Sequence, residues 1–264
     1  MTLAADVLRR PYPSYHKPLE IARAWLRDGT HQSDALELLT LLRSKYAHVL
    51  AIANELVLAL LENDRQAEAM VELGRLDRQF QEVDEETRCR WGSLYKREGD
   101  RAWKDGDLVT AENRFLQALE EYKRGYTLRH GHYPGINQAT LLLLLAALTR
   151  QRKEDSRSQN YLRQAEAVAD DVLARRHKDK GWPTDFADDN IWHPATAGEV
   201  NLLKRNWSEA ASQYAAALRA ANVQPFHRQS IGKQARRILE ALTLLDMRPE
   251  PPFDNPDDFF GPLP

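Results

Sequence analysis

The sequence predicts an all-α fold in which antiparallel helix pairs stack into a solenoid. Three observations lead to this prediction. Apolar residues recur at helical spacing along most of the 264 residues, strand-like alternation is nearly absent, and glycine and proline are sparse away from the ends. Many helices separated by short turns are typical of repeat proteins, in which each helix pair buries its apolar face against the next.

The periodic stretches predict eleven helices, separated by short turns. They cover residues 16–28, 33–45, 48–63, 65–80, 84–104, 108–129, 135–150, 156–177, 191–205, 207–222 and 226–246. The predicted breaks are Asp28-Gly29, Asn63-Asp64, Gly106-Asp107, Pro134-Gly135, Gly181-Trp182-Pro183 and Pro225.

A leucine-rich run, TLLLLLAAL, covers residues 140–148. A helix that spans a membrane needs about 20 apolar residues. This run is shorter, and it is bounded by Gln138 on one side and by the largely basic stretch 150–153 on the other. We therefore expect a helix that is buried between other helices.

The composition indicates a soluble protein with a sizeable core. Hydrophobic residues make up 42% and charged residues 29% of the chain, and the formal net charge is −2. This balance argues against broad nucleic-acid binding, which needs a concentrated basic surface. Cys89 is the only cysteine, so no intrachain disulfide or cysteine-rich metal site can form. The first 20 residues lack the apolar core of a signal peptide, and a cytoplasmic protein is expected.

Two segments share one pattern of small and aromatic residues. Each has a glycine, an alanine twelve positions later, and then the spacing Ala-x-x-x-aromatic-x-x-Ala. The residues are Gly99, Ala111, Phe115 and Ala118 in the first segment and Gly198, Ala210, Tyr214 and Ala217 in the second. The pattern resembles the tetratricopeptide repeat, in which small residues let two helices approach and the aromatic residue fills the gap to the next pair.

Weaker copies of the pattern precede these two. One lies around Ala67 and Val71, and a degenerate one lies around Ala35 and Leu39. We therefore expect residues 1–246 to form a single helical array, with divergent repeats over 14–90. A generic helical bundle with chance alanines is the alternative.

Two segments depart from the simple repeat. An enlarged unit over residues 124–190 combines the leucine-rich helix with the helix 156–177. A long loop, residues 179–194, then leads to the next repeat, and such loops are often functional. The tail, residues 247–264, is rich in proline and aspartate and has three phenylalanines. It cannot be helical throughout. It is expected to be a cap on the last helix pair or a short linear motif.

The order of several motifs is similar to a known family. The motif Tyr-x-Gly-Ile-Asn at residues 133–137, the apolar helix after it, the Trp192 segment and the repeat that ends at Ala217 carry the similarity. They resemble the tetratricopeptide-type TRAFs-binding part of the central regulatory region of apoptosis signal-regulating kinases, which many bacterial proteins share. The resemblance covers about residues 90–245, and the first 80 residues match only as helical repeats.

This resemblance implies a non-catalytic module that needs no cofactor. In the kinases the region is a regulatory scaffold that helps to recruit partners. Bacterial relatives accompany effector or signalling domains in defence-like systems, and some are proposed to sense nucleotide-derived signals. The chain has no glycine-rich phosphate loop and no His-Arg-Asp motif, so kinase activity and TRAF binding are not carried over. A protein partner is expected to be supplied in trans.

Seven residues form the candidate site for a ligand or partner. They are Arg129, Tyr133, Asn137, Thr140, Trp192, Thr196 and Glu199. Helical spacing places Trp192, Ala195 and Glu199 on roughly one face of the helix 191–205, with Thr196 beside them, and it places Thr140 one turn after Asn137. Lys96, Asp100 and Trp103 occupy comparable positions in the earlier repeat. An aromatic floor with fixed hydrogen-bonding groups suits a peptide or a flat polar ligand, and Arg129 suits a phosphate.

Structural roles stay open for the same residues. Asn137 can tie the Pro134-Gly135 turn to the helix, as asparagine often does in turns. Trp192 can be a wedge between repeats, because tryptophan is mostly buried. Glu199 can be a solvated or ion-paired residue on a helix face.

Three histidines, His130, His132 and His193, raise the question of a metal site. A His-x-His pair can begin such a site, but no third ligand lies at helical spacing, so no metal is expected. No Ser-His-Asp order or paired carboxylates stand out, and the chain is not expected to be an enzyme.

Two functions follow from these observations. The first is a non-catalytic scaffold in a bacterial signalling or defence-like system, which binds a protein partner through the solenoid groove. The alternative is a sensor that binds a nucleotide-derived small molecule in a pocket near Tyr133, Asn137 and Trp192. A scaffold predicts an open groove along several repeats, whereas a sensor predicts a closed pocket to which Arg129 also contributes.

Overall fold

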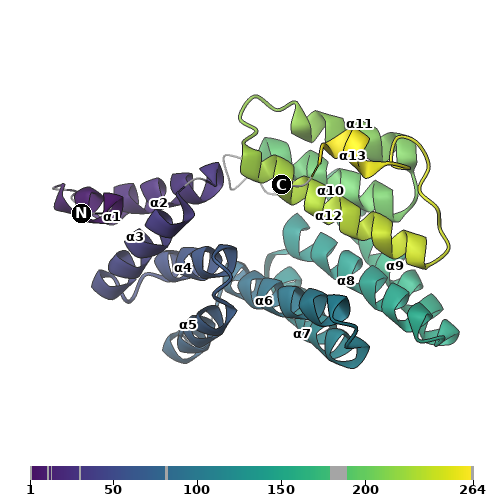
Figure 1. Cartoon of the computed structure of the whole chain (residues 1–264), viewed down its shortest axis with the longest axis horizontal. Coiled ribbons are helices and arrows are strands. Elements are labelled where there is room, and N and C mark those ends of the chain that lie inside the picture. Colours follow the sequence, from purple (N-terminus) through teal and green to yellow (C-terminus); the bar gives the residue numbers. More distant parts are fainter. Residues whose placement is uncertain are drawn as a thin grey trace. The chain divides into compact units, whose positions relative to one another are not determined.

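The structure is a computed structural model that describes residues 2–10, 12, 14–29, 31–80, 83–178 and 189–262. This part of the chain forms thirteen helices and contains no strand, which confirms the predicted all-α, tetratricopeptide-like solenoid (Figure 1). The helices are α1 (Leu3–Arg9), α2 (His16–Asp28), α3 (Gln32–Lys45), α4 (Leu50–Glu62), α5 (Gln66–Gln79), α6 (Glu85–Lys104), α7 (Leu108–Arg129), α8 (His132–Gln151), α9 (Asp155–Lys178), α10 (Asp189–Leu203), α11 (Trp207–Leu218), α12 (Pro225–Leu244) and α13 (Pro256–Phe260).

The eleven predicted helices correspond to α2 to α12, and the differences lie at their ends. α2 and α7 have the predicted bounds, whereas α11 ends at Leu218 rather than at residue 222. α10 begins at Asp189, so residues 189–194 at the end of the predicted loop are helical, and His193 lies on a helix. The predicted helix 191–205 already includes the last four of these residues. Residues 179–188, the rest of that loop, lie outside the described residues. The short helices α1 and α13 were not predicted.

The start of α8 corrects the predicted break at Pro134-Gly135. The chain turns earlier, at His130, whose φ is 53°, and α8 begins at His132. Proline is tolerated in the first turn of a helix, because its missing N–H has no partner there. Gly135 has a packing role: a Cβ at this position would lie 2.5 Å from the Val172 side chain and 3.0 Å from the Tyr126 ring.

The helices form two compact units. The N-terminal unit comprises Met1–Leu94 and Gln224–Phe226, and the C-terminal unit comprises Tyr95–Val223 and His227–Pro264. In the N-terminal unit consecutive helices pack from α2 to α5, and α1 packs on α3. In the C-terminal unit α8 packs between α7 and α9, and α10 packs on α8, α9 and α11. The helix pairs of each unit thus follow the chain order that a repeat array requires.

The two strong repeat copies make the same helix–helix contact. A Cβ at Gly99 would lie 2.5 Å from the Phe115 ring, and a Cβ at Gly198 would lie 2.9 Å from the Tyr214 ring. Both aromatic side chains are fully buried, as are the alanines at 111, 118, 210 and 217. The glycine on the first helix therefore receives the aromatic ring of the second helix, as the sequence pattern predicts.

One of the two weaker copies has a different register. Ala35 and Leu39 are buried as predicted, but Ala67 is exposed and Val71 is 54% exposed, so that assignment is wrong. The buried apolar residues of α5 are instead Ala69, Leu73 and Leu76, and the alanine and the first leucine repeat the same four-residue spacing two positions later. Two overlapping apolar patterns run along this amphipathic helix, and packing against α4 selects the second.

The leucine-rich helix α8 is buried on all sides. Each residue from Pro134 to Thr149 is buried, because α7, α9 and α10 surround this helix. Among the described helices none is long and apolar enough to span a membrane. The prediction of a helix buried between other helices is confirmed.

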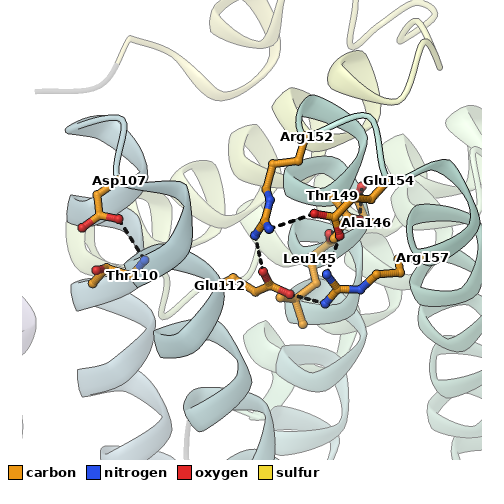
Figure 2. Close-up of polar contacts among 9 residues, drawn as sticks. All are labelled: Asp107, Thr110, Glu112, Leu145, Ala146, Thr149, Arg152, Glu154 and Arg157. Atoms are coloured by element: carbon orange, nitrogen blue, oxygen red, sulfur yellow. Dashed lines mark hydrogen bonds and ion pairs between the residues drawn. The ribbon is translucent and has the colours of Figure 1, made fainter.

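An ion-pair cluster ties α7 to the turn between α8 and α9 (Figure 2). Glu112 on α7 lies between two arginines: Arg152 donates to Oε2 at 2.5 Å, and Arg157 bonds Oε1. Glu154 completes the cluster by pairing with both arginines. The Glu112 side chain is only 11% exposed, so its charge requires these partners.

Candidate functional site

Four helices of the C-terminal unit bring polar side chains together in a group that we call the central polar cluster. It comprises Lys96 and Asp100 on α6, Asn137 and Thr140 on α8, Glu199 on α10, and Gln234 and Arg237 on α12. The residues on α8 and α10 are buried, whereas those on α6 and α12 are partly exposed. The cluster is therefore polar inside and reaches solvent along its α6 and α12 side.

Asn137 connects the cluster to the start of α8. Lys96 Nζ donates to Asn137 Oδ1 at 2.6 Å, and Asn137 Nδ2 donates to the Tyr133 carbonyl at 2.9 Å. The ammonium group also lies 5.9 Å from the centre of the Tyr122 ring, which meets the Tyr133 ring edge to face at 6.0 Å. Asn137 thus ties the first turn of its helix, one of the two roles left open, and also holds a cation.

Glu199 is the acidic group of the cluster. Burial raises the pKa of its carboxyl to about 8, although the charge of Lys96 acts in the opposite direction. At neutral pH the carboxyl is therefore largely protonated and can donate a hydrogen bond as well as accept one.

Tyr214 lies behind Glu199, with its ring against Gly198. Burial raises the pKa of its hydroxyl, and the Glu199 carboxylate adds to the effect. Among the described residues this fully buried hydroxyl has no hydrogen-bond partner. A buried hydroxyl without a partner costs free energy, so its position needs an explanation.

α12 contributes two members that the sequence analysis did not include. Gln234 Nε2 donates to Thr140 Oγ1 at 3.2 Å, and Arg237 forms an ion pair with Asp100. The two residues are three positions apart and share one face of α12. This spacing is visible in the sequence, but the partners lie 94 and 137 positions away along the chain, and nothing local indicates them.

Thr196 belongs to a neighbouring histidine contact and not to the cluster. His132 Nδ1 lies 3.0 Å from Thr196 Oγ1, and the rings of His132 and His193 meet edge to face at 4.7 Å. Burial lowers the pKa of His132 to about 3, and the charge of His193 adds to this. No group of three potential metal ligands occurs in the part of the chain that the structure describes.

The other predicted site residues lie closer to the surface. The Trp192 side chain is partly exposed, and its ring packs on the His227 ring of α12 at 5.2 Å. Tyr133 is 44% exposed, and Arg129 is exposed at the end of α7. Of the seven candidates, Asn137, Thr140 and Glu199 therefore belong to the cluster, and the other four are not members of it.

Comparison with protein families gives one match. A family model described as Tetratricopeptide Repeats-Sensor matches residues 19–142, from α2 into α8. The match supports a tetratricopeptide-type domain, and it lies mostly N-terminal to the segment on which the resemblance to the kinase region depends. No curated protein matches the chain. No solved structure matches it either.

Proposed function

We propose that this protein is a non-catalytic sensor module in which a small polar ligand binds at the central polar cluster. The family match supports a repeat module for protein interaction or sensing. The burial of the site residues favours sensing. A peptide groove requires accessible side chains on the first helices of the repeats, but Asn137, Thr140 and Glu199 are buried.

One observation carries the proposal: Lys96 donates to the buried Asn137 and lies close enough to the buried Glu199 to act on its charge, and the buried Tyr214 hydroxyl has no hydrogen-bond partner among the described residues. Burying such groups costs free energy that an apolar core would avoid. Stacking of the repeats does not need these groups, because the glycine–aromatic contacts already provide the packing. Binding is the role that explains their position.

The chemistry of the cluster favours a nucleotide-derived ligand. The Lys96 ammonium suits an anionic group, and the Glu199 carboxyl suits a pair of hydroxyls. The Tyr122 and Tyr133 rings beside Lys96 suit a flat ring. Nucleotides and their derivatives combine an anionic group, a pair of hydroxyls and a flat ring.

The test is a thermal-shift screen of the full chain against mononucleotides, dinucleotides and cyclic nucleotides. A ligand at about 100 times its Kd stabilises a protein by about 2.7 kcal/mol, which corresponds to a shift of roughly 5 °C or more. Lys96→Met is expected to abolish the shift. Lys233→Met, an exposed lysine on α12 outside the cluster, is the control and is expected to retain it.

A flat response across the panel contradicts the nucleotide class. If Lys96→Met and Lys233→Met retain the thermal shift equally, the ligand binds elsewhere, and the central polar cluster is not its binding site. Calorimetric titration of each compound that shifts the melting temperature separates binding from indirect effects on stability.

Binding of a protein partner is the second candidate function. It is favoured by Arg129 and Tyr133, which are exposed next to each other where α7 ends and α8 begins. An aromatic side chain with a neighbouring arginine is a typical centre of a protein interface. Arg129→Ala combined with Tyr133→Ala is expected to weaken partner binding at least tenfold.

A further inference from the structure

The C-terminal residues 253–261 form a docked segment that we call the strap; it includes α13 (Figure 1). Phe253 is fully buried, and its ring lies 6.4 Å from the Trp207 ring and 5.0 Å from the Phe259 ring. The Phe260 ring meets the Tyr214 ring edge to face at 5.2 Å. The strap thus packs on the end of the repeat stack through its three phenylalanines.

A polar latch on α12 holds the other end of the strap. Arg236 Nη2 donates to Asp257 Oδ1 at 2.6 Å and also bonds the Gly261 carbonyl, while its guanidinium lies 5.7 Å from the centre of the Phe260 ring. A Cβ at Gly232, one turn earlier, would lie 3.5 Å from Phe260 Cβ, an ordinary van der Waals distance. The strap is therefore held on α12 by the contacts of Arg236.

The same helix contributes to the central polar cluster from a different face. Gln234 and Arg237 bond Thr140 and Asp100, whereas Arg236 bonds the strap. Residues two positions apart point to nearly opposite sides of a helix, at about 200°. A rotation or shift of α12 that changes one set of contacts must therefore change the other.

Tyr214 provides a second connection between strap and cluster. One part of its ring is in contact with Gly198, next to Glu199, and its edges meet the rings of Phe253 and Phe260. The Tyr214 side chain is fully buried, and its ring thus contacts both the helix that carries Glu199 and the strap. Packed interiors transmit small displacements because they have few voids to absorb them.

We propose that the strap is a releasable output element whose docking is coupled to the central polar cluster through α12 and Tyr214. The inference rests on the proposed sensor function: occupancy of the cluster changes the exposure of the strap. The released segment presents three phenylalanines together with Asp254, Asp257 and Asp258. It is an acidic, aromatic peptide of the kind that a basic, apolar groove on a partner protein accepts.

Hydrogen exchange measured by mass spectrometry on the full chain tests the coupling without a ligand. Thr140→Val removes the acceptor of Gln234 with little change in side-chain shape. We expect it to accelerate exchange of the strap amides by about fivefold or more. Thr149→Val is the matched control, because Thr149 is also buried on α8 but bonds only the carbonyls of its own helix.

Arg236→Gln provides the reference for a released strap, since it removes the latch without opening a cavity. It is expected to accelerate strap exchange by about tenfold or more. The coupling is overturned if Thr140→Val changes the rate of strap exchange by less than about twofold relative to the parent. It is also overturned if Thr149→Val accelerates strap exchange as much as Thr140→Val does. Exchange that does not respond to Arg236→Gln overturns the latch itself.

These outcomes are independent of the ligand screen. If Thr140→Val accelerates strap exchange but no nucleotide shifts the melting temperature, the coupling of the strap is supported and the nucleotide class of ligand is contradicted. If Lys96→Met abolishes binding of a ligand but strap exchange does not respond to Thr140→Val, the sensor function is supported and the coupling of the strap is contradicted.

Discussion

At the scale of single residues, the environment of each polar group determines what it can do. Glu112 and Glu199 are both largely buried glutamates. Glu112 forms ion pairs with two arginines, whereas Glu199 lies near one lysine whose hydrogen bond goes to Asn137. Burial dominates at Glu199 and favours its neutral form. The same residue type thus has a structural role in one place and the properties of a titratable ligand-binding group in the other.

Glu199→Gln is expected to change the pH dependence of stability. The folded-state pKa of about 8 is raised from 4.5, so the folded chain holds this proton more tightly than the unfolded chain does. The free energy of unfolding therefore falls as the pH rises from about 4.5 to about 8. Glutamine carries no charge, and the variant should be more stable than the parent at pH 8 by on the order of 2 kcal/mol.

Urea denaturation at pH 5 and pH 8 measures this difference. Glu209→Gln, at an exposed position on α11, is the control and should follow the parent at both pH values. If Glu199→Gln and the parent lose the same stability between pH 5 and pH 8, then Glu199 is not buried as the structure has it.

At the scale of helices, glycine–aromatic contacts and ion pairs perform separate tasks. Gly99 and Gly198 bring the helices of a pair close together, each against one aromatic ring. The Glu112 cluster fixes the turn between α8 and α9 against α7. The first kind of contact sets the distance between helices, and the second sets the position of a turn.

Substitutions of two helical glycines by alanine should have opposite effects. At Gly99 the new methyl group would lie 2.5 Å from the Phe115 ring, and overpacking of this kind costs roughly 1–3 kcal/mol. At Gly74 on α5 the nearest atom is 3.5 Å away, and alanine should stabilise the helix by roughly 0.5–1 kcal/mol. Thermal denaturation of Gly99→Ala and Gly74→Ala compares them, and a loss of stability in both would contradict the contact.

Glu112→Ala should destabilise the protein because it leaves Arg152 and Arg157 without their shared carboxylate. The arginines are partly exposed, so we expect a loss of roughly 1–3 kcal/mol, less than for a fully buried pair. Glu68→Ala, which removes an exposed pair with Arg65, should have no measurable effect. Chemical denaturation of the two variants is the measurement, and equal effects would exclude a structural role of the cluster.

At the scale of the whole molecule, the chain forms two compact units, each with buried helices of its own. The cluster, the strap and the glycine–aromatic contacts all belong to the C-terminal unit. The N-terminal unit has a continuous apolar core along α1 to α5. The features that indicate binding are thus concentrated in one of the two units.

A core substitution should lower the stability of its own unit more than that of the other. Leu38→Ala lies in the N-terminal unit and Leu143→Ala in the C-terminal unit, and both side chains are fully buried. Each should cost roughly 2–5 kcal/mol. Hydrogen exchange at increasing urea concentration resolves the two units, and an equal loss of protection in both would show that they unfold together.

The sequence by itself determined the class of fold and most of the helices. Helical periodicity, turn residues and the spacing of glycine, alanine and aromatic residues are local properties, and repeats pack through contacts that lie close in the chain. Gly198 and Tyr214 are only sixteen positions apart, so their contact could be predicted from the repeat pattern. The same local information placed Asn137 and Thr140 one turn apart on a buried helix.

Tertiary packing decided the register of α5, the start of α8 and the membership of the site. On α5 one apolar pattern begins at Ala67 and another at Ala69, and both have helical spacing. The sequence alone therefore does not tell which of the two faces α4. Gln234 reaches Thr140 from 94 positions away, and Arg237 reaches Asp100 from still farther. Such contacts have no local signal, because a polar residue on a helix face looks the same in the sequence whether it meets water or another helix.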